Sequence, residues 1–181
     1  MHTLSGDEGF DALGLHWQVL AAPGHTLSHV LFYAPAAPLG THMAPLLFCG
    51  DTLFSAGCGR LFEGSPAQML HTLAGINALP ADTRICCTHE YTLTNLRFAA
   101  RVYPSNPAIA QHAAHCQHLR DQGLPTLPSS LAQERRVNPF LQALDLGAHP
   151  ALPLHLADSS AAKADALSVF TALRTLRNDF S

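Results

Sequence analysis

The sequence is poor in charged residues, and this scarcity excludes several classes of protein. Asp, Glu, Lys and Arg make up 13% of the 181 residues, and only 10 of them are Lys or Arg, which leaves a net charge of −3. A phosphate backbone binds to a clustered basic surface, so this composition argues against a nucleic-acid partner. No apolar run approaches the roughly 18 residues that a transmembrane helix requires, and we expect no membrane partner.

The sequence also lacks an export signal and a disulfide framework. Residues 1–10 contain no basic stretch followed by an apolar one. The five cysteines are an odd number without a pairing rhythm, and Cys86 and Cys87 are adjacent. This pattern favours free thiols in a reducing compartment, so we expect a cytoplasmic protein. Its hydrophobic content of 48% is sufficient for a sizeable globular core.

Short strands and longer helices alternate along the first half of the chain. Residues 65–79 and 92–102 are predicted as helices, the first opening with Ser65, Pro66 and Gln68 in the pattern of a capping box. Residues 35–45, which contain prolines, are predicted as an exposed loop. Strands rich in Val, Leu, Phe and Tyr are predicted over residues 15–21, 29–34, 45–49 and 84–88. This order predicts an α/β arrangement over residues 1–103.

The composition changes after Tyr103, and the rest of the chain, residues 104–181, is predicted as a small, mostly helical unit. Asn106 and Pro107 form a helix start, and Gly123 marks the end of that helix. Residues 125–128 form a predicted loop. A closing amphipathic helix is predicted over residues 160–177, with these side chains directed inward: Leu167, Phe170, Leu173 and Leu176.

Three histidines, His112, His115 and His118, repeat every three residues along the first of these helices. Their spacing is compatible with a metal site, but a solvated polar stripe is the stronger interpretation of a histidine repeat on a helix.

Three strand-like runs each lead to a residue that can bind a metal ion. His25 follows Pro23-Gly24, Asp51 follows an apolar run and Gly50, and His89 follows the run that ends at Thr88. Neutral imidazole and carboxylate are ligands for Zn²⁺ and similar ions. Each residue alone is more typical of a turn or a helix cap. Together, after three separate strands, they predict one shared site, because a carboxylate beyond an apolar strand is costly unless it is paired or metal-bound.

These segments resemble glyoxalase II, the hydroxyacylglutathione hydrolase branch of the metallo-β-lactamase superfamily. The resemblance lies in Pro23–Thr26, in Cys49–Gly64 and in the segment that begins His89-Glu-Tyr91. Residues 125–131 and 138–141 resemble the helical C-terminal domain of the family. The fold implied is α/β: the C-terminal part of an αββα sandwich over residues 1–103, followed by a small helical glutathione-side domain over residues 104–181.

The resemblance implies a cytoplasmic enzyme of methylglyoxal degradation that hydrolyses S-D-lactoylglutathione, and other 2-hydroxyacylglutathiones, to glutathione and a 2-hydroxy acid. It implies two Zn²⁺ ions, or Fe or Mn in their place. His25 would bind one ion, His89 the other, and Asp51 would bridge both as the central catalytic ligand. Arg60 and Tyr91 match family positions that hold glutathione. The alternative for these two is a surface charge and a rim aromatic.

Three departures from the family pattern stand beside the resemblance. The first metal motif of the family, Thr-His-x-His-x-Asp-His, does not occur, Gln142 stands where an arginine is common, and Phe62 replaces a tyrosine. The chain thus resembles the C-terminal two thirds of a glyoxalase II and supplies half of the metal ligands.

Two other functions remain open alongside the enzyme. The chain could be a degenerate remnant without catalysis that acts as a metal- or partner-binding module. It could also be another superfamily hydrolase such as a persulfide dioxygenase, against which the helical tail argues. Without the strands that precede this region in the family, an apolar sheet face would be exposed, and we expect self-association through it.

Overall fold

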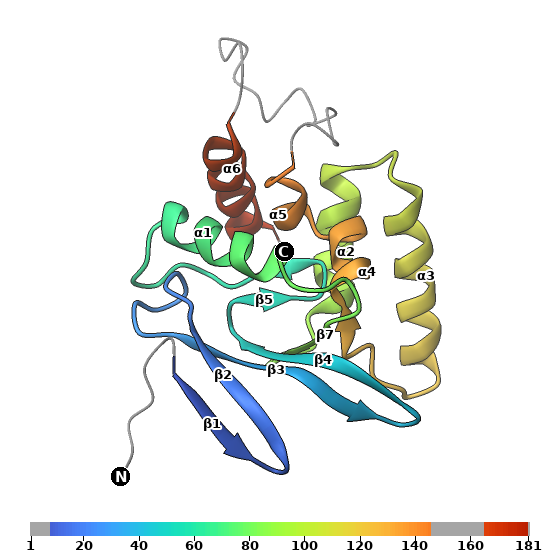
Figure 1. Ribbon diagram of the computed structural model, residues 1–181. Coiled ribbons are helices and arrows are strands. Elements are labelled where there is room, and N and C mark those ends of the chain that lie inside the picture. Colours follow the sequence, from blue (N-terminus) through green and yellow to red (C-terminus); the bar gives the residue numbers. More distant parts are fainter. Residues whose placement is uncertain (1–7, 146–164, 181) are drawn as a thin grey trace.

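The computed structural model describes residues 8–145 and 165–180, which contain a six-stranded sheet and a small two-stranded one (Figure 1). Strands β1 to β4 are antiparallel neighbours, β7 runs parallel to β4, and β8 closes the edge antiparallel to β7. The strands of the large sheet are β1 (Gly9–Ala12), β2 (Leu15–Ala21), β3 (Val30–Leu39), β4 (His42–Gly50), β7 (Arg84–Cys87) and β8 (Ser129–Ser130). The small sheet pairs β5 (Leu53–Phe54) with β6 (Gly57–Cys58).

The helices gather on one side of the large sheet (Figure 1). They are α1 (Pro66–Asn77), α2 (Thr92–Val102), α3 (Pro107–Asp121), α4 (Leu131–Val137), α5 (Pro139–Gln142) and α6 (Ala166–Asp179). A sheet covered by helices on one face is half of an αββα sandwich, so the predicted α/β fold class is confirmed. In the part of the chain that the structure describes, no helix is long and apolar enough to cross a membrane.

The predicted helix starts are confirmed in detail. Ser65 caps α1, its side chain accepting from the Gln68 backbone N–H while the Gln68 side chain accepts from the Ser65 N–H. Asn106 caps α3 by accepting from the Ala108 N–H at 3.0 Å, and Pro107 occupies the first helical position. These side chains satisfy N–H groups that have no partner within the helix, which is why the local sequence alone places the starts correctly.

The loop predicted over residues 35–45 is wrong, because β3 and β4 extend through it and meet at a tight turn containing Gly40. Ala34 pairs with Leu46 but Ala37 pairs with Ala44, so β3 holds one extra residue there. This bulge takes up Pro35 at a point where the strand ladder is interrupted. A proline at a bulge removes no ladder hydrogen bond and does not end the strand.

The closing helix differs from its prediction at both ends of its apolar face. It begins at Ala166 with Asp165 as the N-cap, and the predicted start at Ser160 lies outside the described residues. Phe170 and Leu173 are buried as predicted. Leu167 and Leu176 are each 39% exposed, so the prediction that these two side chains point inward is wrong. Arg174 is buried on the inward face instead. The inward face of the helix therefore carries an unexpected charge.

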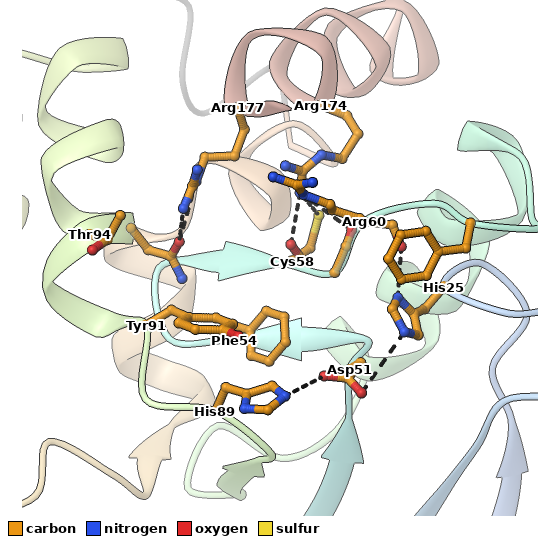
Figure 2. A pocket seen from close by; sticks show the side chains of 13 residues that line it. His25, Asp51, Phe54, Cys58, Arg60, His89, Tyr91, Thr94, Arg174 and Arg177 are labelled. Carbon is orange, nitrogen blue, oxygen red and sulfur yellow. Dashed lines mark hydrogen bonds and ion pairs between the residues drawn. The ribbon is translucent and has the colours of Figure 1, made fainter. Parts of the chain in front are cut away.

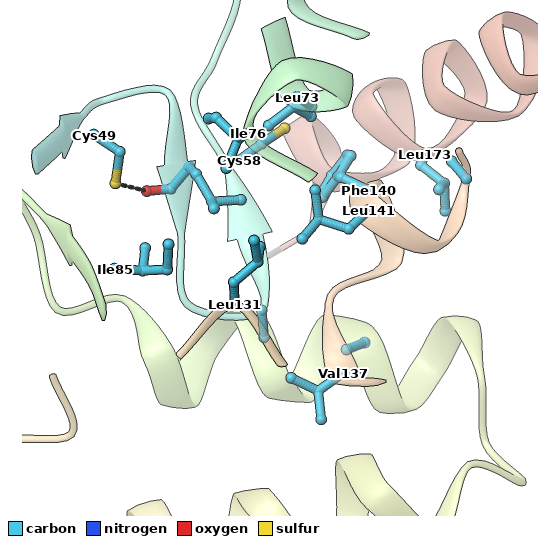
Figure 3. Close-up of a cluster of buried hydrophobic side chains, with 14 of the residues drawn as sticks. Cys49, Cys58, Leu73, Ile76, Ile85, Leu131, Val137, Phe140, Leu141 and Leu173 are labelled. Atoms are coloured by element: carbon cyan, nitrogen blue, oxygen red, sulfur yellow. Dashed lines mark hydrogen bonds between the residues drawn. The ribbon is translucent and has the colours of Figure 1, made fainter. Parts of the chain in front are cut away.

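One cluster of buried side chains runs from the sheet into the helices that follow (Figure 3). The ring of Phe98 on α2 stacks on Phe140 of α5 at 6.1 Å, and Phe140 packs edge-on against Phe170 of α6 at 5.7 Å. Burying Phe98 and Phe170 on either side of Phe140 stabilises the packing between these helices. The two units predicted over residues 1–103 and 104–181 thus share a core, and the boundary between them stays a prediction.

A buried carboxylate joins α4 to the β5–β6 hairpin. Glu134 is fully buried and accepts from the Ser55 hydroxyl at 2.9 Å and the Ala56 backbone N–H at 2.7 Å. Asn138 donates to the same carboxylate and to the backbone oxygens of Phe54 and Gly57. Buried polar groups need such partners. The hairpin is consequently fixed to the helical region by hydrogen bonds that no local sequence pattern predicts.

The sheet face opposite the helices carries a patch of apolar side chains, called here the outer face. Cross-strand partners share a face, and Phe32 pairs with both Val19 and Phe48. Trp17 packs on Phe48 at 5.5 Å, and Phe10 packs on Phe32 at 5.8 Å. Phe48 is still 45% exposed. Exposed apolar area of this kind favours association, which keeps the prediction of a self-associating chain in place.

We expect Phe48→Lys to shift the isolated chain toward the monomer, because a lysine on the outer face disfavours sheet-to-sheet contact. Sedimentation velocity over a range of protein concentrations measures the shift. Leu27→Lys is the matched control, since Leu27 is 56% exposed in the loop between β2 and β3, away from the sheet. A monomeric unsubstituted chain at every concentration would contradict the prediction.

Candidate metal centre and substrate pocket

The three predicted metal ligands lie where strands end. Asp51 follows β4 and His89 follows β7 by two residues, and because these strands are parallel neighbours their carboxyl ends meet at the same edge. His25 lies in the loop between β2 and β3. Gly50 has a left-handed φ of 51°, and a Cβ there would lie 2.6 Å from the ring of His29. A glycine is thus required to turn the chain toward Asp51.

Asp51 lies between the two histidines (Figure 2). Its Oδ2 is 3.9 Å from His25 Nε2, and its Oδ1 is 3.5 Å from His89 Nε2. Within residues 8–145 and 165–180, no three His, Cys, Asp or Glu side chains converge on one point as a metal site. The three residues instead form two pairs that share Asp51. Their assignment as metal ligands stays a prediction.

Hydrogen bonds orient both His25 and Asp51. His25 Nδ1 is 2.8 Å from the backbone oxygen of Arg60. A carbonyl oxygen only accepts, so Nδ1 carries a hydrogen, and Nε2 is the ring nitrogen that faces Asp51. Asp51 Oδ1 accepts from the Thr88 hydroxyl at 2.7 Å. Histidines that bind metals are typically held by this kind of bond to the other ring nitrogen.

Behind the site, His29 holds the backbone of Asp51. Its Nε2 accepts from the Asp51 N–H at 3.3 Å. Burial, reinforced by His25 nearby, lowers the pKa of His29. A neutral ring retains the lone pair that this hydrogen bond requires.

A cavity of about 540 Å³ extends from Asp51 along an aromatic wall. Tyr91 stacks on His89 at 5.0 Å and on the edge of Phe54 at 5.2 Å, while Phe62 packs against His25 at 4.9 Å. Arg60 and Tyr91, the residues predicted to hold substrate, both line this cavity. Both side chains are exposed, so their use in binding stays a prediction, and the alternative of a surface charge and a rim aromatic stays open beside it.

Two arginines of α6, which sequence reasoning missed, line the far end of the cavity (Figure 2). Arg174 donates to the backbone oxygen of Cys58 at 2.8 Å and lies over the Phe140 ring at 5.2 Å, and its Nε has no hydrogen-bond partner among the described residues. Burial, together with the charges of Arg174 and Arg60, lowers the pKa of Arg177. None of the ion pairs between described residues involves Arg60, Arg174 or Arg177. Three guanidinium groups without a carboxylate form an environment for an anion.

The remaining sequence predictions lie outside this cavity or at its edge. Gln142 is 2% exposed and donates to the backbone oxygen of Arg136 at 2.8 Å, so it serves the end of α4 and does not line the cavity. His115 and His118 are exposed, while His112 is half-buried beside Cys116, with 3.6 Å between Nε2 and Sγ. The helical histidines therefore do not contribute to the candidate metal centre.

The fold is that of the metallo-β-lactamases. A metallo-β-lactamase from Staphylococcus aureus superposes with a TM-score of 0.53 at 18% identity, covering 97% of this chain and 43% of that protein. ETHE1 from Myxococcus xanthus superposes with a TM-score of 0.50 at 20% identity, covering 98% of this chain and 60% of that protein. At these identities the likeness establishes the architecture alone.

Sequence similarity identifies the family within that fold. A family profile described as the C-terminus of hydroxyacylglutathione hydrolase matches residues 90–180. The hydroxyacylglutathione hydrolase of Albidiferax ferrireducens is 50% identical over 177 residues, which cover 98% of this chain and 66% of the relative. The enzyme of that name from Dechloromonas aromatica is 46% identical, and the match covers 98% of this chain and 67% of the relative. The one from Pseudomonas aeruginosa is 52% identical, and the match covers 77% of this chain and 52% of the relative. The chain belongs to the hydroxyacylglutathione hydrolase family and spans between about half and two thirds of these relatives.

Proposed function

We propose that the protein acts as a metal-dependent thioester hydrolase that converts S-D-lactoylglutathione to glutathione and D-lactate, within the cytoplasm. The observation that carries the proposal is a single cavity that joins the His25, Asp51 and His89 cluster to three arginines. A glutathione thioester has a carbonyl for one end of such a cavity and peptide carboxylates for the other. The five cysteines are free thiols, which supports a reducing compartment.

The donor chemistry of the cluster fits a pair of divalent ions, for which we propose Zn²⁺, with Fe or Mn as chemically possible alternatives. His25 would hold one ion through Nε2, His89 the other, and the two oxygens of Asp51 would be shared between them. A divalent ion in such a site polarises the substrate carbonyl and lowers the pKa of water. The hydrogen bonds from His25 to Arg60 and from Thr88 to Asp51 keep these donor atoms oriented before any ion binds.

The arginines supply the binding energy for the glutathione part. Glutathione is an anionic tripeptide, and a guanidinium group matches a carboxylate with two parallel hydrogen bonds. Arg174 is 5% exposed and Arg177 is half-buried, so an ion pair formed there is better shielded from water than one on the surface. Tyr91 and Phe54, between the arginines and Asp51, would contact the cysteinyl portion that carries the thioester.

The reaction makes modest demands on the protein as an acid. The leaving group is a thiolate, and a thiol has a pKa of about 8.5, so departure at neutral pH needs no strong proton donor. This agrees with a cavity whose lining residues near Asp51 are histidines and aromatic rings, with no second carboxylate among them. The role left to the chain is to hold the carbonyl beside Asp51 while the arginines hold the peptide.

The decisive test is the loss of thioester absorbance from S-D-lactoylglutathione with added Zn²⁺, measured on two proteins. The 181-residue chain alone should show little or no turnover, because three ligands shared between two ions leave each with only two protein bonds. The same chain preceded by the family segment that contains Thr-His-x-His-x-Asp-His should turn over the thioester. Full activity of the shorter protein would show that the ligand set is wrong. Inactivity of the longer one, with the metal bound, would favour the non-catalytic remnant.

A further inference from the structure

We infer that Asn95 is a positioning residue that orients Arg177 toward the substrate without neutralising its charge, an inference that rests on the proposed function. Asn95 lies on α2, is 4% exposed and lines the cavity. Its Oδ1 accepts from Arg177 Nη2 at 3.2 Å and from Nε at 3.4 Å. Its Nδ2 donates to the backbone oxygen of Ser55 at 3.0 Å, which fixes the amide so that the oxygen faces the arginine.

The position of the amide is set by the small sheet as well as by α2. A Cβ on Gly57 would lie 2.5 Å from Asn95 Nδ2, so only a glycine leaves the amide room at this point of β6. The Ser55 carbonyl that accepts from Asn95 belongs to the hairpin that Glu134 fastens. Asn95 is thus held by two separate elements, and a side chain held in this way can in turn hold the flexible guanidinium of Arg177 in one orientation.

Among the described residues, the other hydrogen bond and the ring contacts of Arg177 are also with uncharged groups. Its Nη1 donates to the Phe180 backbone oxygen at 3.2 Å, and the guanidinium lies over the rings of Phe98 and Phe180 at 5.9 and 5.8 Å. An aspartate in the place of Asn95 would be nearly the same shape and would accept the same two hydrogen bonds. It would also form an ion pair with Arg177, and the anion would have to compete with it. A neutral amide orients the arginine and leaves the whole charge for the ligand.

The test compares Asn95→Asp with Asn178→Asp in binding S-hexylglutathione, a thioether that cannot be hydrolysed, measured by calorimetry on the 181-residue chain. Asn178 follows Arg177 on α6 but is exposed and does not line the cavity. We expect Asn95→Asp to raise the Kd by about tenfold and Asn178→Asp by less than about twofold. The dependence of the Kd on salt concentration should weaken in Asn95→Asp alone, because one charge of the site has been neutralised.

A ligand whose carboxylates are esterified distinguishes this role from a purely structural one. The dimethyl ester of S-hexylglutathione has no carboxylate, so Asn95→Asp and the unsubstituted protein should bind it equally. Equal weakening for the ester and the free acid, or a Kd for the free acid within about twofold of the Asn178→Asp value, would overturn the inference. Failure of the unsubstituted protein to bind the free acid would overturn the proposed function, and the inference with it.

If circular dichroism shows that Asn95→Asp does not fold, a second variant takes its place in the test. Asn95→Ala removes the acceptor and should raise the Kd by about threefold, through the loss of orientation alone. In an Arg177→Gln background the same change should have no further effect, since the orienting contact no longer exists. Additive effects of the two substitutions would show that Asn95 acts independently of Arg177 and would overturn the inference.

Discussion

Replacing Asp51 by alanine should abolish thioester hydrolysis in the protein that carries the complete set of family metal motifs, by about 10³-fold or more. Asp51 faces both His25 and His89, so its removal takes a donor atom from each proposed metal position. Loss of an outer partner of a metal ligand typically costs only about 10- to 100-fold, and loss of a shared ligand should exceed that. The measurement is kcat at saturating substrate, with the bound metal determined on the same sample.

The matched control is Asp82→Ala, which removes an exposed carboxylate that does not line the cavity. It should leave kcat unchanged. In Asp51→Ala the Kd for S-hexylglutathione should stay within about threefold of the original, because the arginines proposed to bind the peptide are intact. Retention of turnover in Asp51→Ala would refute the bridging assignment, and parallel loss of ligand binding would indicate that the variant had unfolded.

Replacing Glu134 by alanine should lower the free energy of unfolding by about 3 kcal/mol or more, one of the largest stability effects we expect. The Ala56 N–H and the Ser55 hydroxyl would lose their acceptor inside a dry region, and the β5–β6 hairpin would lose its attachment to α4. Glu134→Gln is the informative comparison. Its amide oxygen can serve Ala56, and the Ser55 hydroxyl can reverse to accept from the new NH₂, so the cost should be only about 1 kcal/mol. Urea denaturation measures both.

The free energy of unfolding should also depend on pH through Glu134. Burial raises the pKa of Glu134 above its ordinary value of 4.5, even though Ser55, Ala56 and Asn138 donate to it. The folded protein therefore keeps this proton to higher pH than the unfolded chain does. As the pH rises from about 4.5 through the raised pKa, the contribution of Glu134 to the free energy of unfolding falls. Glu134→Gln should lack this decline in the free energy of unfolding. An identical decline in Glu134→Gln and in the unsubstituted protein would assign the decline to other groups.

Local sequence predicted the elements whose signals are local. The helix starts at Ser65 and Asn106 were correct because capping is decided by residues three or fewer positions apart. Asp51 and His89 were selected as candidates because strands β4 and β7 contain apolar runs that stop abruptly beside them. The prolines in β3 misled the prediction, since whether a proline ends a strand or sits in a bulge depends on the partner strand.

The far end of the cavity was missed because its residues are distant in sequence. Arg174 and Arg177 lie more than 110 residues after Cys58 and Arg60, and no local pattern joins them. A signal was nevertheless present: the two arginines are three positions apart and continue the buried face of Phe170 and Leu173. Charged residues on the apolar face of a helix need a partner, and asking what anion could provide it would have indicated the site.

The hydrogen bond from His25 to the backbone oxygen of Arg60 links the two ends of the cavity energetically. The peptide unit that orients the histidine belongs to Arg60, which we propose contacts the glutathione part of the substrate. Whatever free energy an ion gains from a fixed His25 is therefore linked to the conformation of the Arg60 segment. Such linkage is reciprocal, so whatever factor a bound ion applies to the affinity for the thioester, the thioester applies to the affinity for the ion.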